Sequence, residues 1–393
     1  MEPSTEKRIN IIGGGIYGIT AALELSRRGY KVSVFDRDII PHPDASSTDI
    51  TKMIRADYGD DELYADLMHE AFQGWDAWNQ KFPRQMYHQT GFLLLTSQAM
   101  QPDSFERQSL QTMQKKNFPI QQLYSGFLQN RFPSWNAEKY RDGYYNARGG
   151  WAESANVVAQ LVQMARQAGV QIHEGDSFAH FIEKGNQIEG IKTTSGQVHS
   201  ASQTIVAAGA WTPSILPELK ACLAVKGQPV FHLLPENPNL FKGEVFPGWS
   251  ADMSKTGWYG FPAQADGVVK IGNHGIGIEK DPNTEIEIPE KYFVALRKFL
   301  SESLPALKDA PIVKTRVCMY CDSWDGNFYI DHHPDKPGLL VATGGSGHGF
   351  KFAPILGNII ADVLERKPNF YAHRFRWRAA GQQKFEAARS TNF

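Results

Sequence analysis

The pattern of apolar and polar positions predicts its clearest structural unit at the start of the chain. Residues 8–12 form a short apolar run that ends in consecutive glycines, and apolar positions then recur at helical spacing until Gly29. A glycine at that place is typical of the residue that follows a helix. A second apolar run, residues 31–35, ends at Asp36. This order of strand, glycine turn, helix and strand predicts the first βαβ unit of a doubly wound sheet.

Weaker patterns predict the remaining architecture. Residues 156–169 and 352–365 carry the apolar periodicity of helices. Strand patterns occur at residues 170–173, 187–194, 203–207, 245–249, 257–261, 267–272 and 338–342. The segment 82–145 is polar and aromatic and is interrupted by prolines, which indicates a second domain inserted between pieces of the first.

Composition and charge exclude several classes of protein. The 393 residues are 41% hydrophobic and 21% charged with a formal net charge of −1, so no overall field attracts nucleic acid or an anionic membrane. Apolar runs stay far below the ~20 residues that span a bilayer, and the N-terminus lacks the apolar core of a signal peptide. Three cysteines favour a reducing compartment over a disulfide scaffold. Since the C-terminus is not a serine-lysine-leucine address, we expect a cytoplasmic protein.

The motif Gly13-x-Gly15-x-x-Gly18 lies between the first strand and the first helix and indicates a dinucleotide site. The first glycine allows a tight turn, the second lets a pyrophosphate approach the backbone, and the third allows close helix–strand packing. The helix N-terminus offers N–H groups and partial positive charge to the phosphates. Asp36 can accept hydrogen bonds from a ribose diol, which favours FAD or NAD over NADP. A purely structural glycine turn is the alternative.

Two features favour FAD over NAD. Residues 204–211 run from a strand into the small-residue turn Ala208-Gly209, which permits backbone contact with a cofactor on the sheet. An ordinary strand exit has the same pattern. No second GxGxxG motif occurs that could hold NAD separately.

The chain resembles the monomeric sarcosine oxidase family of FAD amine oxidases, which includes pipecolate, saccharopine and fructosyl amino acid oxidases. The segments that carry the resemblance, in order, are the glycine motif and residues 51–55, 259–262, 270–274, 318–320 and 345–351. The resemblance covers nearly the whole chain. It implies an α/β fold with a Rossmann-like FAD-binding domain of the glycine/D-amino-acid oxidase type, in residues 1–81, 146–219 and 318–393. An inserted, mostly antiparallel β-sheet substrate domain would comprise residues 82–145 and 220–317.

The resemblance implies that Cys318 attaches FAD covalently through its sulfur. A buried inert thiol is one alternative, and a metal or redox site shared with Cys321 is another, although zinc would need two further ligands. Cys321 departs from the commoner family residue, and Lys52 stands where sarcosine oxidases have arginine. The residues assigned to the cofactor are Gly13, Gly15, Ile16, Tyr17, Gly18, Asp36, Arg37, Ser47, Thr48, Lys52, Val170, Ala208, Gly209, Trp211, Cys318, Met319, Gly345, Gly347, His348, Gly349 and Lys351.

Lys270 matches the family's lysine at the flavin edge where oxygen reacts. A cation about 4 Å from a developing negative charge contributes roughly 4 kcal/mol at an effective dielectric of ~20, or about three decades of rate. His274 and Tyr259 are implied as further catalytic residues. The alternatives are a solvated surface lysine, an ordinary core histidine and a plain core tyrosine.

Arg55 and Lys351 resemble the pair that holds the substrate carboxylate, and Tyr320 is implied as a further substrate contact. A guanidinium binds a carboxylate bidentately, and an ammonium adds a point charge. Two cations in an aromatic pocket would select an amino acid over a simple amine. A surface ion pair of Arg55 with the aspartates that follow it, and a core role for Tyr320, are the alternatives.

The resemblance implies oxidation of the C–N bond of a secondary amino acid, N-substituted or cyclic, to an imine that hydrolyses. Oxygen would be reduced to hydrogen peroxide. Segments 44–50 and 55–60 look more like those of saccharopine, pipecolate and fructosyl amino acid oxidases, which favours a substituent bulkier than methyl. A flavin dehydrogenase, a non-catalytic flavin-binding subunit and an NAD-dependent dehydrogenase are the rival functions. We expect a monomer with no metal, nucleic-acid or membrane partner.

Overall fold

A mainly parallel six-stranded sheet organises one half of the protein. The computed structural model describes residues 7–124, 126–384 and 388–390, and in it the strand order is β20-β21-β13-β1-β2-β9. The strands are β20 (Tyr329–His332), β21 (Leu339–Thr343), β13 (Gln203–Val206), β1 (Arg8–Ile12), β2 (Lys31–Asp36) and β9 (Gln171–Glu174). Neighbouring strands are parallel except at β20 and β21. Strand order reverses at β1, and such a switch point is where doubly wound sheets bind their ligands.

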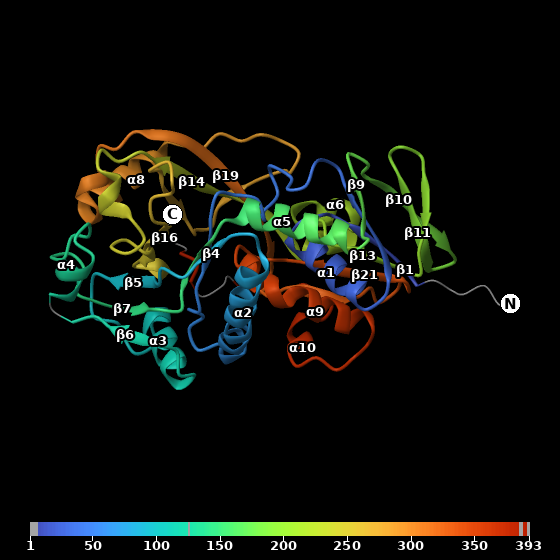
Figure 1. Cartoon of the computed structure of the whole chain (residues 1–393), viewed down its shortest axis with the longest axis horizontal. Helices are drawn as coiled ribbons and strands as arrows, with labels where there is room; N and C mark the ends of the chain where they lie inside the picture. Colours follow the sequence, from blue (N-terminus) through green and yellow to red (C-terminus); the bar gives the residue numbers. More distant parts are fainter. Residues whose placement is uncertain (1–6, 125, 385–387, 391–393) are drawn as a thin grey trace.

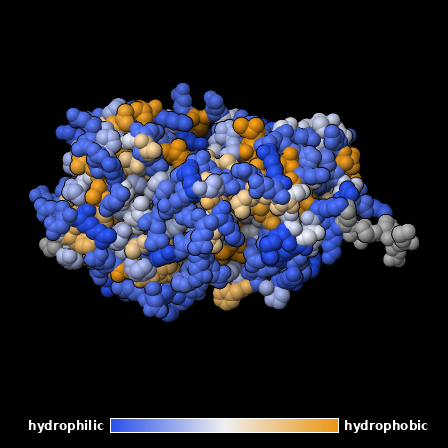
Figure 2. All heavy atoms as spheres, in the orientation of Figure 1, coloured by the Kyte–Doolittle hydropathy of each residue, from blue (hydrophilic) through white to orange (hydrophobic). Residues whose placement is uncertain are grey.

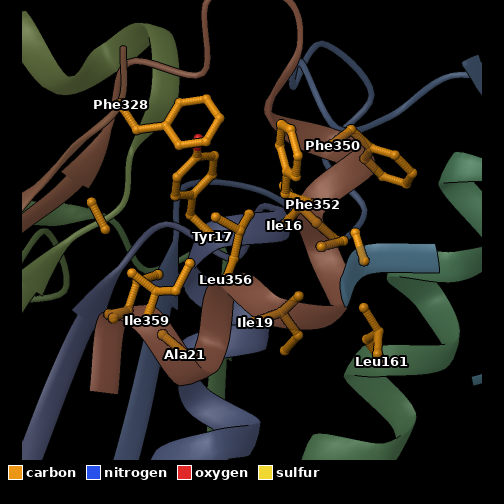
Figure 3. Close-up of a cluster of buried hydrophobic side chains, with 14 of the residues drawn as sticks. Ile16, Tyr17, Ile19, Ala21, Leu161, Phe328, Phe350, Phe352, Leu356 and Ile359 are labelled. Atoms are coloured by element: carbon orange, nitrogen blue, oxygen red, sulfur yellow. The ribbon is translucent and has the colours of Figure 1, made fainter. Parts of the chain in front are cut away.

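The two faces of this sheet are covered differently (Figure 1). Helices α1 (Ile16–Arg27), α5 (Ser154–Gln167) and α9 (Ala353–Leu364) pack into one apolar core. Figure 3 shows Ile16, Tyr17 and Ile19 of α1 beside Leu356 and Ile359 of α9 and Leu161 of α5. On the other face, residues of the six-stranded sheet form a second apolar core with residues of a three-stranded sheet. Its strands are β10 (Phe178–Lys184), β11 (Gln187–Thr193) and β12 (Val198–Ser200). The result is a layered α/β unit.

A nine-stranded, mostly antiparallel sheet organises the other half. Its order is β18-β14-β17-β16-β15-β5-β7-β6, with β19 paired to β14, and only β15 and β5 run parallel. The strands are β18 (Ile278–Glu279), β14 (Leu223–Leu233), β17 (Val269–Asn273), β16 (Trp258–Gly260), β15 (Gly248–Ala251), β5 (Phe92–Thr96), β7 (Asp142–Asn146), β6 (Ile120–Gln122) and β19 (Ile312–Ser323). An aromatic-rich core joins one face of this sheet to helix α8 (Glu290–Ser303).

The remaining elements include one long helix and several short helices and turns. The helices are α2 (Glu62–Lys81), α3 (Phe105–Lys115), α4 (Phe127–Arg131), α6 (Thr212–Ile215), α7 (Met253–Thr256) and α10 (Ala372–Phe375). The 3-10 turns are η1 (Gly209–Trp211), η2 (Pro217–Ala221), η3 (Pro238–Phe241), η4 (Pro305–Leu307) and η5 (Gly349–Phe352). A third small sheet has the order β3 (Lys52–Ile54), β8 (Gly150–Ala152), β4 (Tyr87–His88).

Strand alternation decides which side chains of the nine-stranded sheet can reach a site. Trp258 and Ile271 belong to the aromatic-rich core. Their neighbours Tyr259 and Lys270 point to the opposite face, because successive residues of a strand alternate between faces. That face is turned toward the six-stranded sheet, so one short pair of strands contributes both to the core and to the functional site.

The predicted βαβ unit agrees with β1, α1 and β2, and Gly29 follows α1 with a φ of +88°. The strand predicted at residues 245–249 is wrong over its first half, since Val245 donates a backbone hydrogen bond to the Lys242 carbonyl in a turn. The pattern missed β14 and β19, the two longest strands. β19 also continues across the predicted boundary at residue 318.

The surface is hydrophilic over most of the face shown in Figure 2, with apolar side chains in small groups. Among the helices of the described residues, none has both the length and the apolar character needed to cross a membrane.

Candidate active site

A cavity of about 520 Å³ lies at the carboxyl ends of β1, β2 and β13. The turn that follows β1 supplies Gly13 and Gly15, β2 supplies Asp36, and the turn after β13 supplies Ala208. Side chains of the nine-stranded sheet, among them Tyr259 on β16, form the facing wall. The cavity therefore runs between the two sheets and is built by both.

The glycine turn leaves the backbone open at one end of this cavity. Gly13 has a φ of +103°, and a side chain there would collide with the Ala207 carbonyl. A side chain at Gly18 would collide with the Gly13 carbonyl oxygen, so this glycine allows the close approach of α1 to β1. Ser47 Oγ accepts a hydrogen bond from the Ile16 N–H at 2.9 Å, at the start of α1.

The residues present fit an FAD molecule. Asp36 Oδ2 accepts a hydrogen bond from the Gly14 N–H at 2.7 Å, which holds the carboxylate at the edge of the glycine turn. Burial raises the pKa of Asp36. The Tyr17 hydroxyl lies in the cavity lining and is buried without a hydrogen-bond partner among the described residues. A buried polar atom of this kind is normally satisfied, so it is suited to a polar ligand.

Lys270 lies at the opposite end, fully buried on β17 and 1% exposed. Its ammonium donates to Asp49 Oδ2 and to the Thr51 carbonyl, both at 2.6 Å, and lies 4.7 Å from the centre of the Phe261 ring. Burial lowers the pKa of Lys270 to about 8, a shift that the Asp49 carboxylate partly opposes. The alternative of a solvated surface lysine is wrong.

Sequence patterns did not identify Asp49 as a site residue, although it is the main partner of Lys270 at that end of the cavity. Its carboxylate lies between Lys270 and Lys52, whose Nζ is 3.6 Å away. Burial would raise the pKa of Asp49, but Lys270, Lys52 and Arg316 together hold it well below its usual range. Asp49 therefore acts as the counter-ion of two lysines that line the cavity.

The two cysteines of the Cys-x-x-Cys segment face different surroundings. Cys318 Sγ accepts a hydrogen bond from Lys52 Nζ at 3.2 Å and packs with Val230 and Tyr320. Cys321 lines the cavity and also belongs to the core that includes β11, with its thiol 3.7 Å from Thr343 Oγ1. Burial raises the pKa of Cys321 to about 11, so this thiol stays protonated at neutral pH.

Arg55 and Lys351 converge on one aromatic ring. The Arg55 guanidinium lies 5.7 Å and the Lys351 ammonium 5.0 Å from the centre of the Tyr58 ring. Arg55 is 4% exposed and donates to the Asp57 carbonyl, so the alternative of a surface ion pair is wrong. Tyr58, which the sequence did not single out, contacts two buried cations that both line the cavity.

A chain of hydrogen bonds fixes Lys351. Lys351 Nζ donates to the Tyr58 hydroxyl at 3.0 Å, and that hydroxyl lies 3.1 Å from His348 Nδ1. His348 Nε2 lies 2.9 Å from the Gly326 carbonyl, which can only accept, so we assign the proton to Nε2. Tyr58 then donates to Nδ1, and the imidazole orients the phenol that positions Lys351.

Tyr259 and Tyr320 share a hydrogen bond, and burial raises the pKa of both phenols above the usual value. The Tyr320 ring lies 5.8 Å from the His274 ring. Gly347, with a φ of +76°, leaves the space that the Tyr320 ring occupies. The two phenols, which stay protonated, form an aromatic wall with His274 at the lysine end of the cavity.

Residues 388–390 support this aromatic wall from behind. Arg389 pairs with Asp322 through two hydrogen bonds, of which Nη2 to Oδ1 measures 2.8 Å, and its guanidinium lies 5.6 Å from the Tyr320 ring. Both charged side chains are buried. The Ser390 N–H donates to the His274 carbonyl at 3.1 Å. Sequence patterns gave no signal for Arg389 or Asp322.

The structure brings most of the predicted site residues to the cavity wall. They are Gly13, Gly15, Ile16, Tyr17, Asp36, Arg37, Ser47, Lys52, Arg55, Ala208, Gly209, Trp211, Tyr259, Lys270, His274, Tyr320, Gly345, Gly347, His348, Gly349 and Lys351. Five predicted cofactor residues, Gly18, Thr48, Val170, Cys318 and Met319, lie outside the lining set. The Val170 N–H is used at the end of α5, where it donates to the Ala165 carbonyl.

Comparisons with known proteins agree with this architecture. Residues 8–363 match the family described as FAD dependent oxidoreductase. N-methyl-L-tryptophan oxidase of Salmonella dublin is 30% identical over 369 residues, which cover 92% of this chain and 95% of that protein. The enzyme of the same name from Salmonella typhimurium is 30% identical over 375 residues, covering 93% and 97%.

Solved structures show the same fold. Fructosyl amine: oxygen oxidoreductase (Amadoriase I) from Aspergillus fumigatus superposes with a TM-score of 0.80 and 27% identity, covering 96% of this chain and 91% of that one. Fructosyl peptide oxidase from E. terrenum gives a TM-score of 0.82 at 23% identity, covering 98% and 94%, a likeness of fold. The predicted fold class is confirmed.

Proposed function

This chain belongs to the family of FAD-dependent oxidoreductases and, within it, to the amine oxidases that resemble monomeric sarcosine oxidase; from that premise we propose that it oxidises a secondary amino acid carrying an apolar or aromatic group. The observation that carries the proposal is the convergence of Arg55 and Lys351 on Tyr58 at one end of the cavity. Two buried cations there suit a carboxylate. Bound FAD would accept a hydride from the carbon beside the substrate nitrogen.

The lining of the cavity favours an apolar substituent over a sugar. Met53, Phe92, Met253, Phe261 and Phe350 supply apolar surface there. Among the lining residues that the structure describes, Asp36 is the one carboxylate, and it lies at the glycine turn. A polyhydroxylated group would need acceptors of its own, while the two tyrosines already share a hydrogen bond. N-methylated aromatic amino acids fit this chemistry.

The residues of this chain would position the substrate and stabilise charge that develops during the reaction. They would not act as a base that removes a proton. Arg55 and Lys351 would hold the substrate carboxylate. The neutral phenols of Tyr259 and Tyr320 would lie beside the substrate carbon that reacts. An amine that binds neutral needs no strong base. Lys270 and Lys52 supply positive charge where electrons pass to oxygen, and hydrogen peroxide is the expected product.

A screen for peroxide formation tests the substrate class. The purified protein would be given N-methyl aromatic amino acids, sarcosine, pipecolate and fructosyl amino acids in air. We expect the highest kcat/KM with an aromatic or large apolar amino acid. Preferred turnover of a fructosyl amino acid would overturn the apolar assignment. A yellow protein that no amino acid bleaches under anaerobic conditions would overturn the enzymatic function.

Replacing Lys351 with methionine should weaken recognition of the carboxylate. A hydrogen bond to a charged group contributes about 1.5–3 kcal/mol, so kcat/KM should fall about tenfold to a hundredfold, mainly through KM. The same variant should lose little with an amine substrate that has no carboxylate. Lys336→Met, at a half-exposed ion pair with Glu183, is the matched control. Equal losses on both substrates would contradict the assignment.

We further propose that Cys318 carries the flavin covalently, as the resemblance implies, because its sulfur accepts a hydrogen bond from Lys52, which lines the cavity. Cys318→Ser should release the yellow colour into the supernatant on acid precipitation, whereas the parent retains it in the pellet. Cys321→Ser, which changes the protonated thiol of the same strand, should retain the colour. Retention by Cys318→Ser would show that another residue makes the bond.

A further inference from the structure

An asparagine from the nine-stranded half of the protein closes the dinucleotide end of the cavity. Asn283 lies in the loop between β18 and α8, far from the six-stranded sheet in sequence. Its Oδ1 accepts hydrogen bonds from Arg37 Nη1 at 2.5 Å and from Trp211 Nε1 at 2.9 Å. All three side chains line the cavity. A single amide oxygen thus joins the two halves of the protein.

The partners of Asn283 come from the two strand ends that border the glycine turn. Arg37 directly follows Asp36 at the end of β2, and Trp211 ends the η1 turn that follows β13. The Arg37 guanidinium also lies 5.5 Å from the centre of the Trp211 ring. His42 contacts the same indole at 5.2 Å. These contacts hold an aromatic ring and a cation together over one end of the cavity.

The loop that presents Asn283 is itself ordered by local hydrogen bonds. The Asn283 N–H donates to Asp281 Oδ1 at 2.8 Å, and the Thr284 hydroxyl donates to the Asp281 carbonyl at 3.2 Å. Lys280 Nζ donates to the Thr284 carbonyl. The backbone that carries the Asn283 amide is therefore ordered by the loop itself, which lowers the entropic cost of placing its oxygen against Arg37 and Trp211.

We propose that Asn283 is a latch that slows release of the dinucleotide part of FAD. The inference rests on the proposed function, because it assumes that FAD fills the cavity. Arg37, Trp211 and Asp36 line the same end of the cavity, where the adenosine moiety would bind, and the bonds to Asn283 hold the first two side chains over that end. The latch acts on cofactor retention and is a positioning device for Arg37 and Trp211, separate from the reacting end at Lys270.

The release rate of FAD tests the latch. A Cys318→Ser background removes any covalent bond, and release is then followed by the rise of flavin fluorescence after dilution. Asn283→Ala should release FAD about tenfold faster, since two hydrogen bonds of modest net strength are lost. Asn283→Asp keeps an acceptor oxygen and should retain the parent's rate or a slower one. Trp211→Phe, which removes one of the two donors, should give an intermediate rate.

Asn239→Ala, at an exposed asparagine of η3, is the matched control and should release FAD at the parent's rate. An unchanged rate in Asn283→Ala, or equal acceleration in Asn283→Asp, would overturn the latch while leaving the proposed function intact. Failure of the parent protein to bind FAD at all would overturn the proposed function, and the latch with it.

Discussion

Lys270→Met should slow reoxidation of the reduced enzyme by oxygen about a hundredfold while leaving reduction by the substrate almost unchanged. A lone ammonium near the reacting oxygen would raise the rate of reoxidation by about three decades. The Asp49 carboxylate, 2.6 Å from Lys270 Nζ, offsets part of that positive charge, and Lys52 remains in the variant. Anaerobic reduction and stopped-flow mixing with oxygen measure the two half-reactions separately.

The matched control is Lys226→Met, which removes a lysine paired with the exposed carboxylate of Glu279. This variant should keep both half-reactions at the parent's rates. Equal slowing of reduction and reoxidation in Lys270→Met would assign this lysine to substrate binding or to structure instead.

The same lysine predicts a pH dependence. Because the pKa of Lys270 is lowered to about 8, its ammonium is present below that pH and is lost as the pH rises through it. Reaction with oxygen should therefore fall above pH 8. Asp49→Asn removes the charge that raises the pKa of Lys270, so the fall should move to lower pH. A pH profile that Asp49→Asn leaves unchanged would contradict this account.

Asp322→Asn should destabilise the folded protein by about 3–5 kcal/mol, the range measured when one partner of a buried ion pair is removed. Asp322 and Arg389 are 4% and 2% exposed in their side chains, so water cannot replace the lost carboxylate. Urea denaturation of parent and variant measures the difference. The Tyr320 wall should loosen as well, since Arg389 packs against that ring.

The exposed pair of Lys308 and Asp309 provides the control, with side chains 58% and 87% exposed. Asp309→Asn should change stability by less than about 0.5 kcal/mol. The double variant Asp322→Asn, Arg389→Gln should recover part of the loss, because it no longer buries an arginine opposite a neutral amide. An Asp322→Asn variant as stable as the parent would show that the pair is not a major stabilising contact.

Sequence patterns predicted those features that depend on local geometry. The glycine motif was recognisable because a turn, a close helix approach and an open backbone each require glycine at a fixed spacing. Lys270, Arg55 and Lys351 came from the resemblance to a family, as no periodic pattern distinguishes a lysine of the site from one on the surface.

The remaining features depend on contacts between distant segments. Asp49 and Lys270 are 221 residues apart, and Asn283 lies 246 residues from Arg37. Neither aspartate nor asparagine in a polar loop signals a partner. β14 was missed because Gly227, Pro229 and several polar residues interrupt its alternation, and its length is fixed by pairing with β19.

The ladder between β14 and β19 has a mechanical consequence. It pairs Leu223 with Ser323 at one end and Leu233 with Ile312 at the other, so a stiff ribbon passes from one half of the molecule into the other. A hinge motion that separates the two halves would bend or break this pair of strands. We therefore expect substrate and product to enter and leave through local movements of loops and side chains, while the two sheets keep their relative position.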